Sequence, residues 1–425
     1  MEVAIIGAGM AGLAAARVLQ AHGVACELFE ATDRLGGRAR DLVDHAGVLP
    51  VELGPEFIHG RPESTLSLLH AARLGFDAIR DVHHRRDHGG LVPIVRIWER
   101  FGALLSSATH DESARAFLAR QHLSPEDLQL FAMLIEGFYA APLDDIGILS
   151  IAADASGAAG DEATQARIRG GYGKLVGWLV DQLRRVPIHT CCTVHAIDHT
   201  GSTVAIEHSR GTAHASRAIV TLPVGVLAAG TCSLRLGDHA RALDGLAMGQ
   251  VVKLVICLDD AVWRDYAPLD VEFVHGGETG FPIYWLRSAF DAHQITAWAG
   301  GRHALALAGR TIVELVDGAV DGLAALLGMP RARLMTAVRH HHMHDWAADP
   351  FALGAYSYTR VGGGEAAALL ARPLDGKIWL AGEATSTDYE GTVAGALESG
   401  TRAAEEILTS LAARPSLRPT GLQSR

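Results

Sequence analysis

A single lysine interrupts an apolar run in the second half of the chain. In QVVKLVICL, residues 250–258, aliphatic residues flank Lys253 on both sides, and the run predicts a buried strand. A fully buried lysine is rare unless it is paired with an acid or used in chemistry. Because a strand alternates its faces, Lys253 could instead point to solvent. Lys253 is therefore a candidate catalytic residue, and other motifs must decide between the two positions.

The N-terminal stretch carries a second chemical signal, a glycine-rich turn between a strand and a helix. EVAIIGAGMAGLAAARVL holds Gly7, Gly9 and Gly12 in the spacing GxGxxG. The first glycine allows the tight turn, the second lets the backbone approach a pyrophosphate, and the third lets the helix pack against the strand. A second apolar strand, ACELFE, ends at Glu30, where an acid binds a ribose 2′-hydroxyl. These residues predict a dinucleotide site.

The composition limits the class of protein. The chain has 425 residues, of which 49% are apolar and 20% charged, which predicts a folded chain of two or three domains. The net charge of -11 argues against a nucleic-acid partner. Five cysteines without metal or redox spacing favour a reducing compartment, so we expect a cytoplasmic protein without a membrane span. The oligomeric state stays open between monomer and dimer.

Histidine is abundant but gives no metal signal. The stretch RHHHMHD, residues 339–345, reads as a strand or loop edge. Neighbouring residues of a strand point to opposite faces, whereas metal ligands must converge on one point. We therefore expect no metal site.

The residues after Glu30 carry a family resemblance. Gly36, Gly37 and Arg38 in ATDRLGGRAR resemble the continuation of the flavin-containing amine oxidases and their glutathione-reductase-like relatives. In that family the arginine reaches the phosphates of the flavin, so the resemblance implies FAD as cofactor. The alternative for these residues is a basic loop that closes a β-hairpin.

Further segments resemble the same family in the same order. VELGPEFIHG, residues 51–60, resembles the segment along the isoalloxazine ring and includes Gly54. Val194 in TCCTVHAI matches the valine that contacts adenine, and Trp346 begins the matched segment WAADPFALGAYSY.

The C-terminal segment 378–408 is the most specific match. IWLAGEATSTDYEGTVAGALESGTRAAEEIL resembles the closing strand, the flavin-contacting turn with Gly382 and Glu383, and the final helix. The helix start at Thr392 and Val393 would aim N–H groups at the N1–C2=O edge of the flavin.

The resemblance implies the architecture. The fold class would be α/β, with a glutathione-reductase-like FAD-binding Rossmann domain and an inserted α+β substrate domain whose mixed sheet is flanked by helices. The FAD-binding domain would comprise residues 1–75, 190–250 and 366–425, and the substrate domain residues 76–189 and 251–365.

The resemblance also implies the reaction. An amine is oxidised to an imine by hydride transfer to flavin N5, the imine hydrolyses to an aldehyde plus an amine, and O₂ is reduced to H₂O₂. Lys253 falls on the family's lysine that hydrogen-bonds a water beside N5. Ala355 occupies the place of the cysteine that links flavin in monoamine oxidases, so FAD is expected to be noncovalent.

Several residues bear on the class of substrate. Phe57 stands where related amino-acid oxidases carry an arginine for the substrate carboxylate, although Arg61 is nearby and could replace it. His59 matches a histidine of several polyamine oxidases that hydrogen-bonds a substrate nitrogen, and its alternative is a loop histidine that caps backbone groups. Tyr356 with Thr392 resembles the polyamine oxidase and lysine-demethylase branch rather than the two aromatic rings of monoamine oxidases. The alternative for Tyr356 is a core tyrosine.

A polyamine site needs acids for the distal ammonium groups. The candidates in the first insert are Glu136, Asp144, Asp145 and Glu162, and Trp285 and Trp298 are candidates for the pocket wall. We expect a small amine as substrate, with a polyamine or diamine first, a monoamine second and an L-amino acid third. A desaturase-like flavoprotein that acts on a carbon skeleton remains a further alternative. A histone demethylase is not expected, because the catalytic fold uses up the chain.

Overall fold

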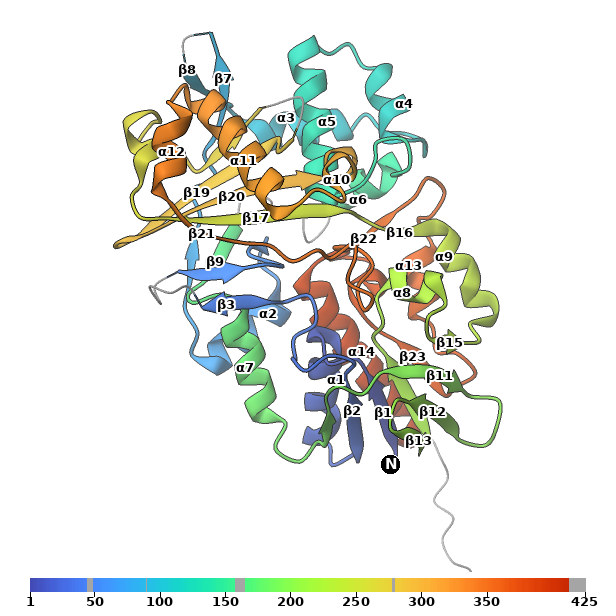
Figure 1. Cartoon of the computed structure of the whole chain (residues 1–425). Helices are drawn as coiled ribbons and strands as arrows, with labels where there is room; N and C mark the ends of the chain where they lie inside the picture. The colour runs from blue at the N-terminus through green and yellow to red at the C-terminus, as the bar shows by residue number, and fades with distance from the viewer. Residues whose placement is uncertain (44–48, 89, 157–164, 277–279, 413–425) are drawn as a thin grey trace, which may run out of the picture.

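The structure is a computed structural model that describes residues 1–43, 49–88, 90–156, 165–276 and 280–412. Two large sheets organise it, one in the lower and one in the upper part of Figure 1.

The lower sheet is parallel and contains the N-terminal strand. Its order is β10-β2-β1-β14-β23, with β1 (Val3–Ile6), β2 (Cys26–Phe29), β10 (Ile188–His189), β14 (Arg217–Val220) and β23 (Ile378–Leu380). Every residue of β1 is buried, which explains its unbroken aliphatic run, since a parallel sheet is covered on both faces.

Helices cover one face of the parallel sheet. These are α1 (Met10–Ala21), α2 (Glu63–Ala72), α7 (Tyr172–Gln182) and α14 (Val393–Ala412). Helix α14 crosses α1 closely, because a Cβ on Gly400 would lie 2.1 Å from the carbonyl oxygen of Ala11. The other face packs on a four-stranded sheet and short helices: β11 (Val194–Asp198), β12 (Val204–His208), β13 (Gly211–Ala215), β15 (Ser233–Leu234), α8 (Val224–Ala229), α9 (Ala242–Gly245) and α13 (Ala366–Ala371).

The upper sheet is mixed and has seven strands in the order β21-β17-β20-β19-β18-β7-β8. The strands are β7 (His83–Asp87), β8 (Gly90–Pro93), β17 (Val251–Leu258), β18 (Phe273–His275), β19 (Ile283–Ala289), β20 (Ala292–Gly300) and β21 (Val338–His342).

The upper sheet has a different set of helices on each side. One set is α10 (Arg302–Leu307), α11 (Ile312–Leu327) and α12 (Arg331–Ala337), and the other is α3 (Ile97–Leu105), α4 (Ala114–Ala119), α5 (Pro125–Tyr139) and α6 (Ile148–Ser156). Ser124 is the N-cap of α5, because its side chain accepts a hydrogen bond from the Asp127 N–H.

Strand β17 is buried on both faces, as its sequence predicts. Leu254 and Ile256 face the core that includes α11, whereas Val255 and Cys257 pack on Val51 of β4 (Pro50–Glu52) and on Leu53 after it. By the alternation of a strand, Lys253 shares the second face and points away from the α11 core.

Small sheets connect the two parts: β3 (Asp41–Val43) with β4 (Pro50–Glu52), β5 (Ile58–His59) with β9 (Gln165–Ile168) and β6 (Phe76–Ala78), and β16 (Leu246–Met248) with β22 (Ser357–Thr359). Three short 3₁₀ segments are η1 (Gly237–Arg241), η2 (Val262–Asp265) and η3 (Glu383–Thr385). Leu175 and Leu179 of α7 share the core of β1, and β10 pairs with β2. Residues from Tyr172 onward therefore pack with the parallel sheet, earlier than the predicted boundary at residue 190.

Candidate active site

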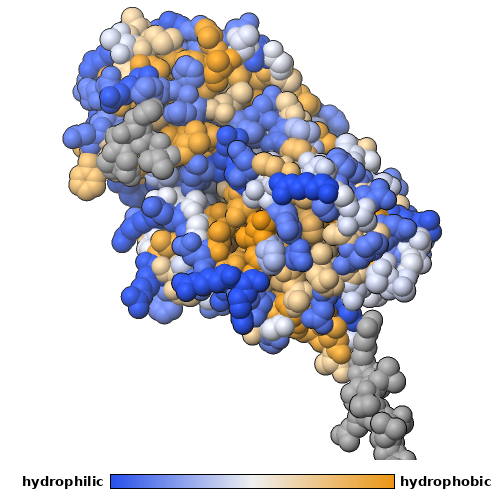
Figure 2. Space-filling view, turned by 60° about the horizontal axis from the view of Figure 1, so that its bottom comes forward, coloured by the Kyte–Doolittle hydropathy of each residue, from blue (hydrophilic) through white to orange (hydrophobic). Residues whose placement is uncertain are grey.

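One cavity of about 500 Å³ runs between the two sheets. It begins at the glycine-rich turn, with Gly7 and Gly9, and continues to Trp285 and Trp298 of the upper sheet. In Figure 2 hydrophobic side chains are set back near the middle of the face that is shown, with hydrophilic side chains around them. A single cavity thus joins the predicted dinucleotide site to the predicted substrate site.

The glycine turn has the shape that its spacing predicts. Gly7 has a φ of +99°, and a Cβ on Gly12 would lie 2.0 Å from the Gly7 carbonyl oxygen. Helix α1 starts at Met10, so its first N–H groups point into this end of the cavity. Glu30 lines the same end, and its carboxylate accepts hydrogen bonds from the Ala8 N–H and from Thr32. A Cβ on Gly7 would lie 2.4 Å from the Thr221 hydroxyl oxygen, so both glycines are needed for the tight turn that presents its N–H groups to a pyrophosphate.

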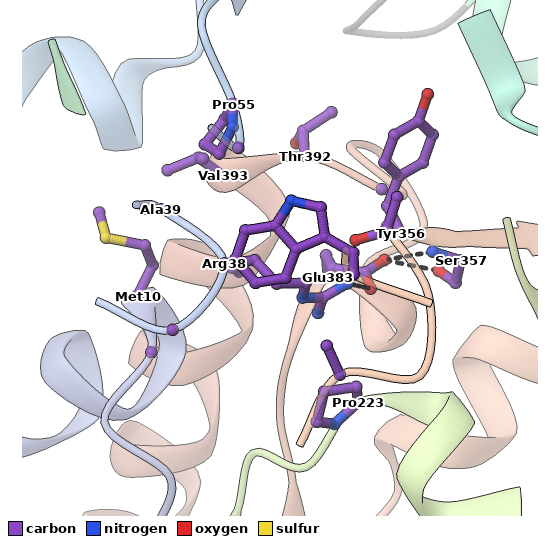
Figure 3. A pocket seen from close by; sticks show the side chains of 18 of the residues that line it. Met10, Arg38, Ala39, Pro55, Pro223, Tyr356, Ser357, Glu383, Thr392 and Val393 are labelled. Carbon is purple, nitrogen blue, oxygen red and sulfur yellow. Dashed lines mark hydrogen bonds and ion pairs between the residues drawn. The ribbon is translucent and has the colours of Figure 1, made fainter. Parts of the chain in front are cut away.

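Arg38 and Glu383 meet in the middle of the cavity, as Figure 3 shows. The Arg38 Nη1 atom donates to Glu383 Oε1 at 2.7 Å and to the Ala355 carbonyl oxygen at 2.8 Å. Ser357 donates its hydroxyl to the other oxygen of Glu383 at 2.5 Å. The two predicted FAD residues, which are 345 positions apart in the chain, therefore form one ion pair.

Four more predicted cofactor residues lie on the cavity wall, namely Gly37, Gly54, Val194 and Gly382. Gly37 has a φ of +59°, and a Cβ there would come within 3.0 Å of Gly9. Trp346 also lines the cavity, and its indole N–H donates to the Leu53 carbonyl oxygen at 2.8 Å. The glycines, the Arg38–Glu383 pair and the helix start fit a bound FAD.

Thr392 and Val393 line the cavity where α14 begins. The Thr392 hydroxyl donates to the Tyr389 carbonyl oxygen at 2.8 Å and accepts from the Gly395 N–H at 3.1 Å. These bonds make Thr392 an N-cap and use its hydroxyl proton, so Thr392 has no side-chain donor left for a ligand. Tyr356 lies near Thr392 in Figure 3 and donates its hydroxyl to the Phe138 carbonyl oxygen at 2.7 Å.

Lys253 is buried and lines the cavity, with only 3% of its surface exposed. Its Nζ atom donates to Glu56 Oε2 at 3.0 Å and to the Gly54 carbonyl oxygen at 3.1 Å. The solvent-facing alternative is thus excluded, and the lysine is both paired with an acid and placed on the cavity wall. The sequence did not single out Glu56 as its partner.

Aromatic rings form the wall beyond Lys253. The Phe57 ring is in edge contact with Trp285 at 5.5 Å and with His59 at 6.1 Å between centroids. Trp285 also lies 5.6 Å from Trp298, so both predicted wall tryptophans are part of the cavity. Burial lowers the pKa of His59 to about 4, so this histidine is neutral at pH 7.

The structure corrects the choice of acids. Glu136 is 1% exposed but forms an ion pair with Arg302, and Asp144 is exposed and forms one with Arg115. Asp145 accepts bonds from Tyr358 and Arg360. None of the three is among the described residues that line the cavity, and Glu162 lies outside the described residues.

Two other acids take their place. Asp154 of α6 and Glu390, two residues before Thr392, both line the cavity. Burial raises the pKa of Asp154 to about 6 and that of Glu390 to about 8. Within the described part of the chain, neither carboxylate forms an ion pair with a lysine or an arginine. Only the position of Glu390 beside the predicted Thr392 could have signalled its role.

The cavity also bears on an amino-acid substrate. Arg61 is exposed and is not among the described lining residues, whose arginines are Arg34 and Arg38 of the turn after Glu30. No arginine in the described lining thus replaces the one that is missing at Phe57. In the described chain there is also no group of three or more His, Cys, Asp or Glu that could hold a metal ion. Nor does any helix in those ranges have the length and apolarity to cross a membrane.

A dinucleotide turn that opens into an aromatic-lined cavity between two sheets is typical of a flavoprotein oxidoreductase. The chain belongs to the flavin-containing amine oxidoreductase family, whose model matches residues 10–408. This membership confirms the predicted family and makes FAD the cofactor for which the turn is built. The predicted fold class is confirmed as well, by the solved structures below.

Several curated relatives match nearly the whole chain at low identity. Lysine-specific histone demethylase 1B of Mus musculus is 25% identical over 96% of this chain and 52% of its own length. Polyamine oxidase 3 of Oryza sativa subsp. japonica is 27% identical over 95% of this chain and 88% of its own. The chain spans about half the length of the Mus musculus demethylase, and between 30% and 57% of the demethylases that it matches.

Solved structures show the same fold. Cyclohexylamine oxidase from Brevibacterium oxydans IH-35A has a TM-score of 0.83 at 20% identity and covers 97% of this chain and 99% of its own. Wild-type putrescine oxidase bound to putrescine has a TM-score of 0.81 at 19% identity and covers 96% and 99%.

Proposed function

We propose that this chain is an FAD-dependent amine oxidase whose preferred substrate is a diamine or polyamine. The observation that carries the choice of substrate is the pair of cavity carboxylates, Glu390 and Asp154, without a protein cation among the described residues. A second ammonium group of the substrate would favour the ionised form of these acids and pair with it.

FAD, when bound, supplies the acceptor for the two electrons removed from the carbon next to nitrogen. The imine product would hydrolyse to an aldehyde plus an amine, and O₂ would take the electrons as H₂O₂. The residues proposed to hold FAD are those of the glycine turn, Glu30, the Arg38–Glu383 pair and the start of α14. Because the cysteine of linked flavins is replaced by Ala355, we propose noncovalent binding.

The reacting amine must be neutral, because its lone pair assists the loss of hydride. The rings of Phe57, Trp285, Trp298 and Tyr356 would exclude water and so favour the neutral amine at the reacting end. His59 is itself neutral and lines this wall, so it can hydrogen-bond a substrate nitrogen without repelling it. Lys253 would hold a water molecule in the cavity through a remaining N–H of its ammonium group.

The distal ammonium would bind at the acidic end. Glu390 and Asp154 lie close enough for the charge of Asp154 to raise the pKa of Glu390. In a poorly hydrated cavity, one cation between two carboxylates offsets their mutual repulsion. It stabilises the ionised carboxylates more than water does. A monoamine can occupy the aromatic part of the cavity but leaves this end without a cation, and an L-amino acid lacks an arginine partner.

Anaerobic mixing with a panel of amines tests the proposal. Purified protein with a flavin spectrum would be mixed with putrescine, spermidine, spermine, benzylamine, tyramine and several L-amino acids, and the bleaching of flavin absorbance would be followed. Rapid bleaching by a diamine or polyamine is the expected result. Faster bleaching by benzylamine or by an amino acid would contradict the substrate class, and no bleaching by any amine would favour the desaturase-like alternative.

A further inference from the structure

We propose that Glu56 is a positioning residue that keeps Lys253 charged and fixed on the cavity wall. The proposal rests on the flavin oxidation proposed above but not on the choice of amine. Glu56 lies in the loop between β4 and β5, and Lys253 lies in β17, so the pair ties the flavin side of the cavity to the upper sheet.

Hydrogen bonds hold both carboxylate oxygens of Glu56 in place. Its carboxylate accepts from Lys253 Nζ at 3.0 Å, from Arg167 Nε at 2.8 Å, and from the Trp285 indole N–H at 3.0 and 3.1 Å to its two oxygens. Burial would raise the pKa of Glu56, but the positive charges of Lys253, Arg167 and Arg287 outweigh it and lower the pKa to about 2. Glu56 is therefore ionised, and with its oxygens occupied it is not a second acceptor for a substrate ammonium.

Most of the hydrogen-bond donors of Lys253 are also used within the protein. An ammonium group has three N–H donors, and Glu56 and the Gly54 carbonyl oxygen take two of them. The structure gives the third no acceptor among the described residues, although Nζ also lies 5.6 Å from the Trp285 ring centroid. Because Lys253 lines the cavity, the third donor is the one available to a molecule inside it.

Glu56 is the hydrogen-bonded anion of Lys253 in a charged network that also contains Arg287, 3.9 Å from Glu56, and its partner Glu52. Arg167 links Glu56 to Glu272 through a 2.7 Å bond from Nη1, so the buried set of Lys253, Arg167, Glu56 and Glu272 holds two cations and two anions. Removal of the Glu56 charge would leave Lys253 without a hydrogen-bonded counter-charge, which is costly, because the other carboxylates whose pKa Lys253 lowers, Asp41 and Glu52, do not accept from its ammonium group. Such an ammonium loses its proton more easily, and with it the fixed charge on the wall.

The pH dependence of flavin reoxidation tests this role without any amine substrate. The holoenzyme would be reduced with dithionite and mixed with O₂ between pH 6 and 10, using the wild type, Glu56→Gln, Lys253→Met and the double variant. We expect Glu56→Gln to add a step in which the rate falls about tenfold toward the Lys253→Met level as the pH rises. The step should vanish in the double variant, because Lys253 is then absent.

Glu272→Gln is the matched control. It removes a charge from the same buried network but contacts Arg167 and not Lys253, so it should destabilise the protein without adding the step. A Glu56→Gln profile that superimposes on the wild type, or a step that persists in the double variant, would overturn the proposal.

Two further measurements keep the proposal testable if Glu56→Gln loses its flavin. Thermal unfolding of flavin-free protein should show that the two single variants each lower Tm by a few degrees and that the double variant lowers it by less than their sum. Glu56→Asp keeps the charge but shortens the reach, so its reoxidation should be several-fold slower without the new step. Additive Tm losses, or full speed in Glu56→Asp, would each contradict a positioning role.

Discussion

Thr359 donates its hydroxyl to Glu390, with Oγ1 at 2.9 and 3.1 Å from the two carboxylate oxygens. A hydroxyl has one proton, so this counts as a single donor. The Ser357 hydroxyl lies 3.4 Å from Glu390 but 2.5 Å from Glu383, so its proton goes to Glu383. Glu390 is thus a cavity carboxylate with one neutral donor, whereas Glu383 also has Arg38. Of these two acids, Glu390 is therefore the one that has no protein cation among the described residues.

Glu390→Gln should change the substrate preference rather than the chemistry. We expect kcat/KM for putrescine to fall about 10- to 100-fold, the worth of a charge-assisted hydrogen bond, while kcat/KM for n-butylamine stays within about twofold. Asp144→Asn is the control, because Asp144 is exposed and outside the described cavity lining. Equal losses for both amines in Glu390→Gln would refute the assigned role.

The pH dependence of stability should reveal the same residue. The pKa of Glu390 is raised to about 8 in the folded protein by burial, above its ordinary value of 4.5. Between these values the unfolded chain gives up a proton that the folded protein retains, so this residue makes the folded state less stable as the pH rises from about 4.5 to 8. Tm measured from pH 5 to 9 should therefore fall more steeply for the wild type than for Glu390→Gln. Parallel curves would contradict the raised pKa.

Gly12→Ala should abolish FAD binding. Its Cβ would lie 2.0 Å from the Gly7 carbonyl oxygen, so either the turn or α1 must move. Gly177→Ala in α7 is the matched control, since nothing lies within 4 Å of its Cβ, and alanine should stabilise the helix by about 0.5–1 kcal/mol. The flavin-to-protein ratio and Tm measure both effects. Full flavin content in Gly12→Ala would show that the turn is not the cofactor site.

Arg38→Met should lower both flavin content and stability. It leaves Glu383, whose side chain is 5% exposed, without its cation, at a cost of about 3 kcal/mol. Arg169→Met removes an exposed pair with Asp77 and should cost less than about 1 kcal/mol. Urea unfolding and the absorbance ratio would compare the two variants, and equal effects would contradict a structural role for the Arg38–Glu383 pair.

Local signals predicted the nucleotide side of the molecule. The glycine spacing, the acid at Glu30 and the segment around Glu383 are each read within a few residues, because the turn geometry depends on local backbone conformation. The strand around Lys253 was also predicted locally, but the apolar run left open whether Lys253 points to solvent, and the structure shows it buried.

The acids could not be predicted in the same way. Whether Glu136 faces the cavity depends on where Arg302 packs, which is 166 positions away in the chain and leaves no local pattern. The partner of Lys253 was missed for the same reason, because Glu56 and Lys253 meet across 197 positions. A buried charge is set by the fold around it, so the sequence could limit the candidates but not choose among them.

The ratio of kcat/KM for putrescine to that for n-butylamine tests the central claim most directly. The two amines have the same four-carbon chain and differ at one end, where putrescine carries a second ammonium group. The account predicts that the wild type favours putrescine by at least about tenfold at pH 8 and that Glu390→Gln removes most of this preference. A wild-type enzyme that oxidises n-butylamine as well as putrescine would contradict the claim that the acidic end of the cavity selects a second ammonium.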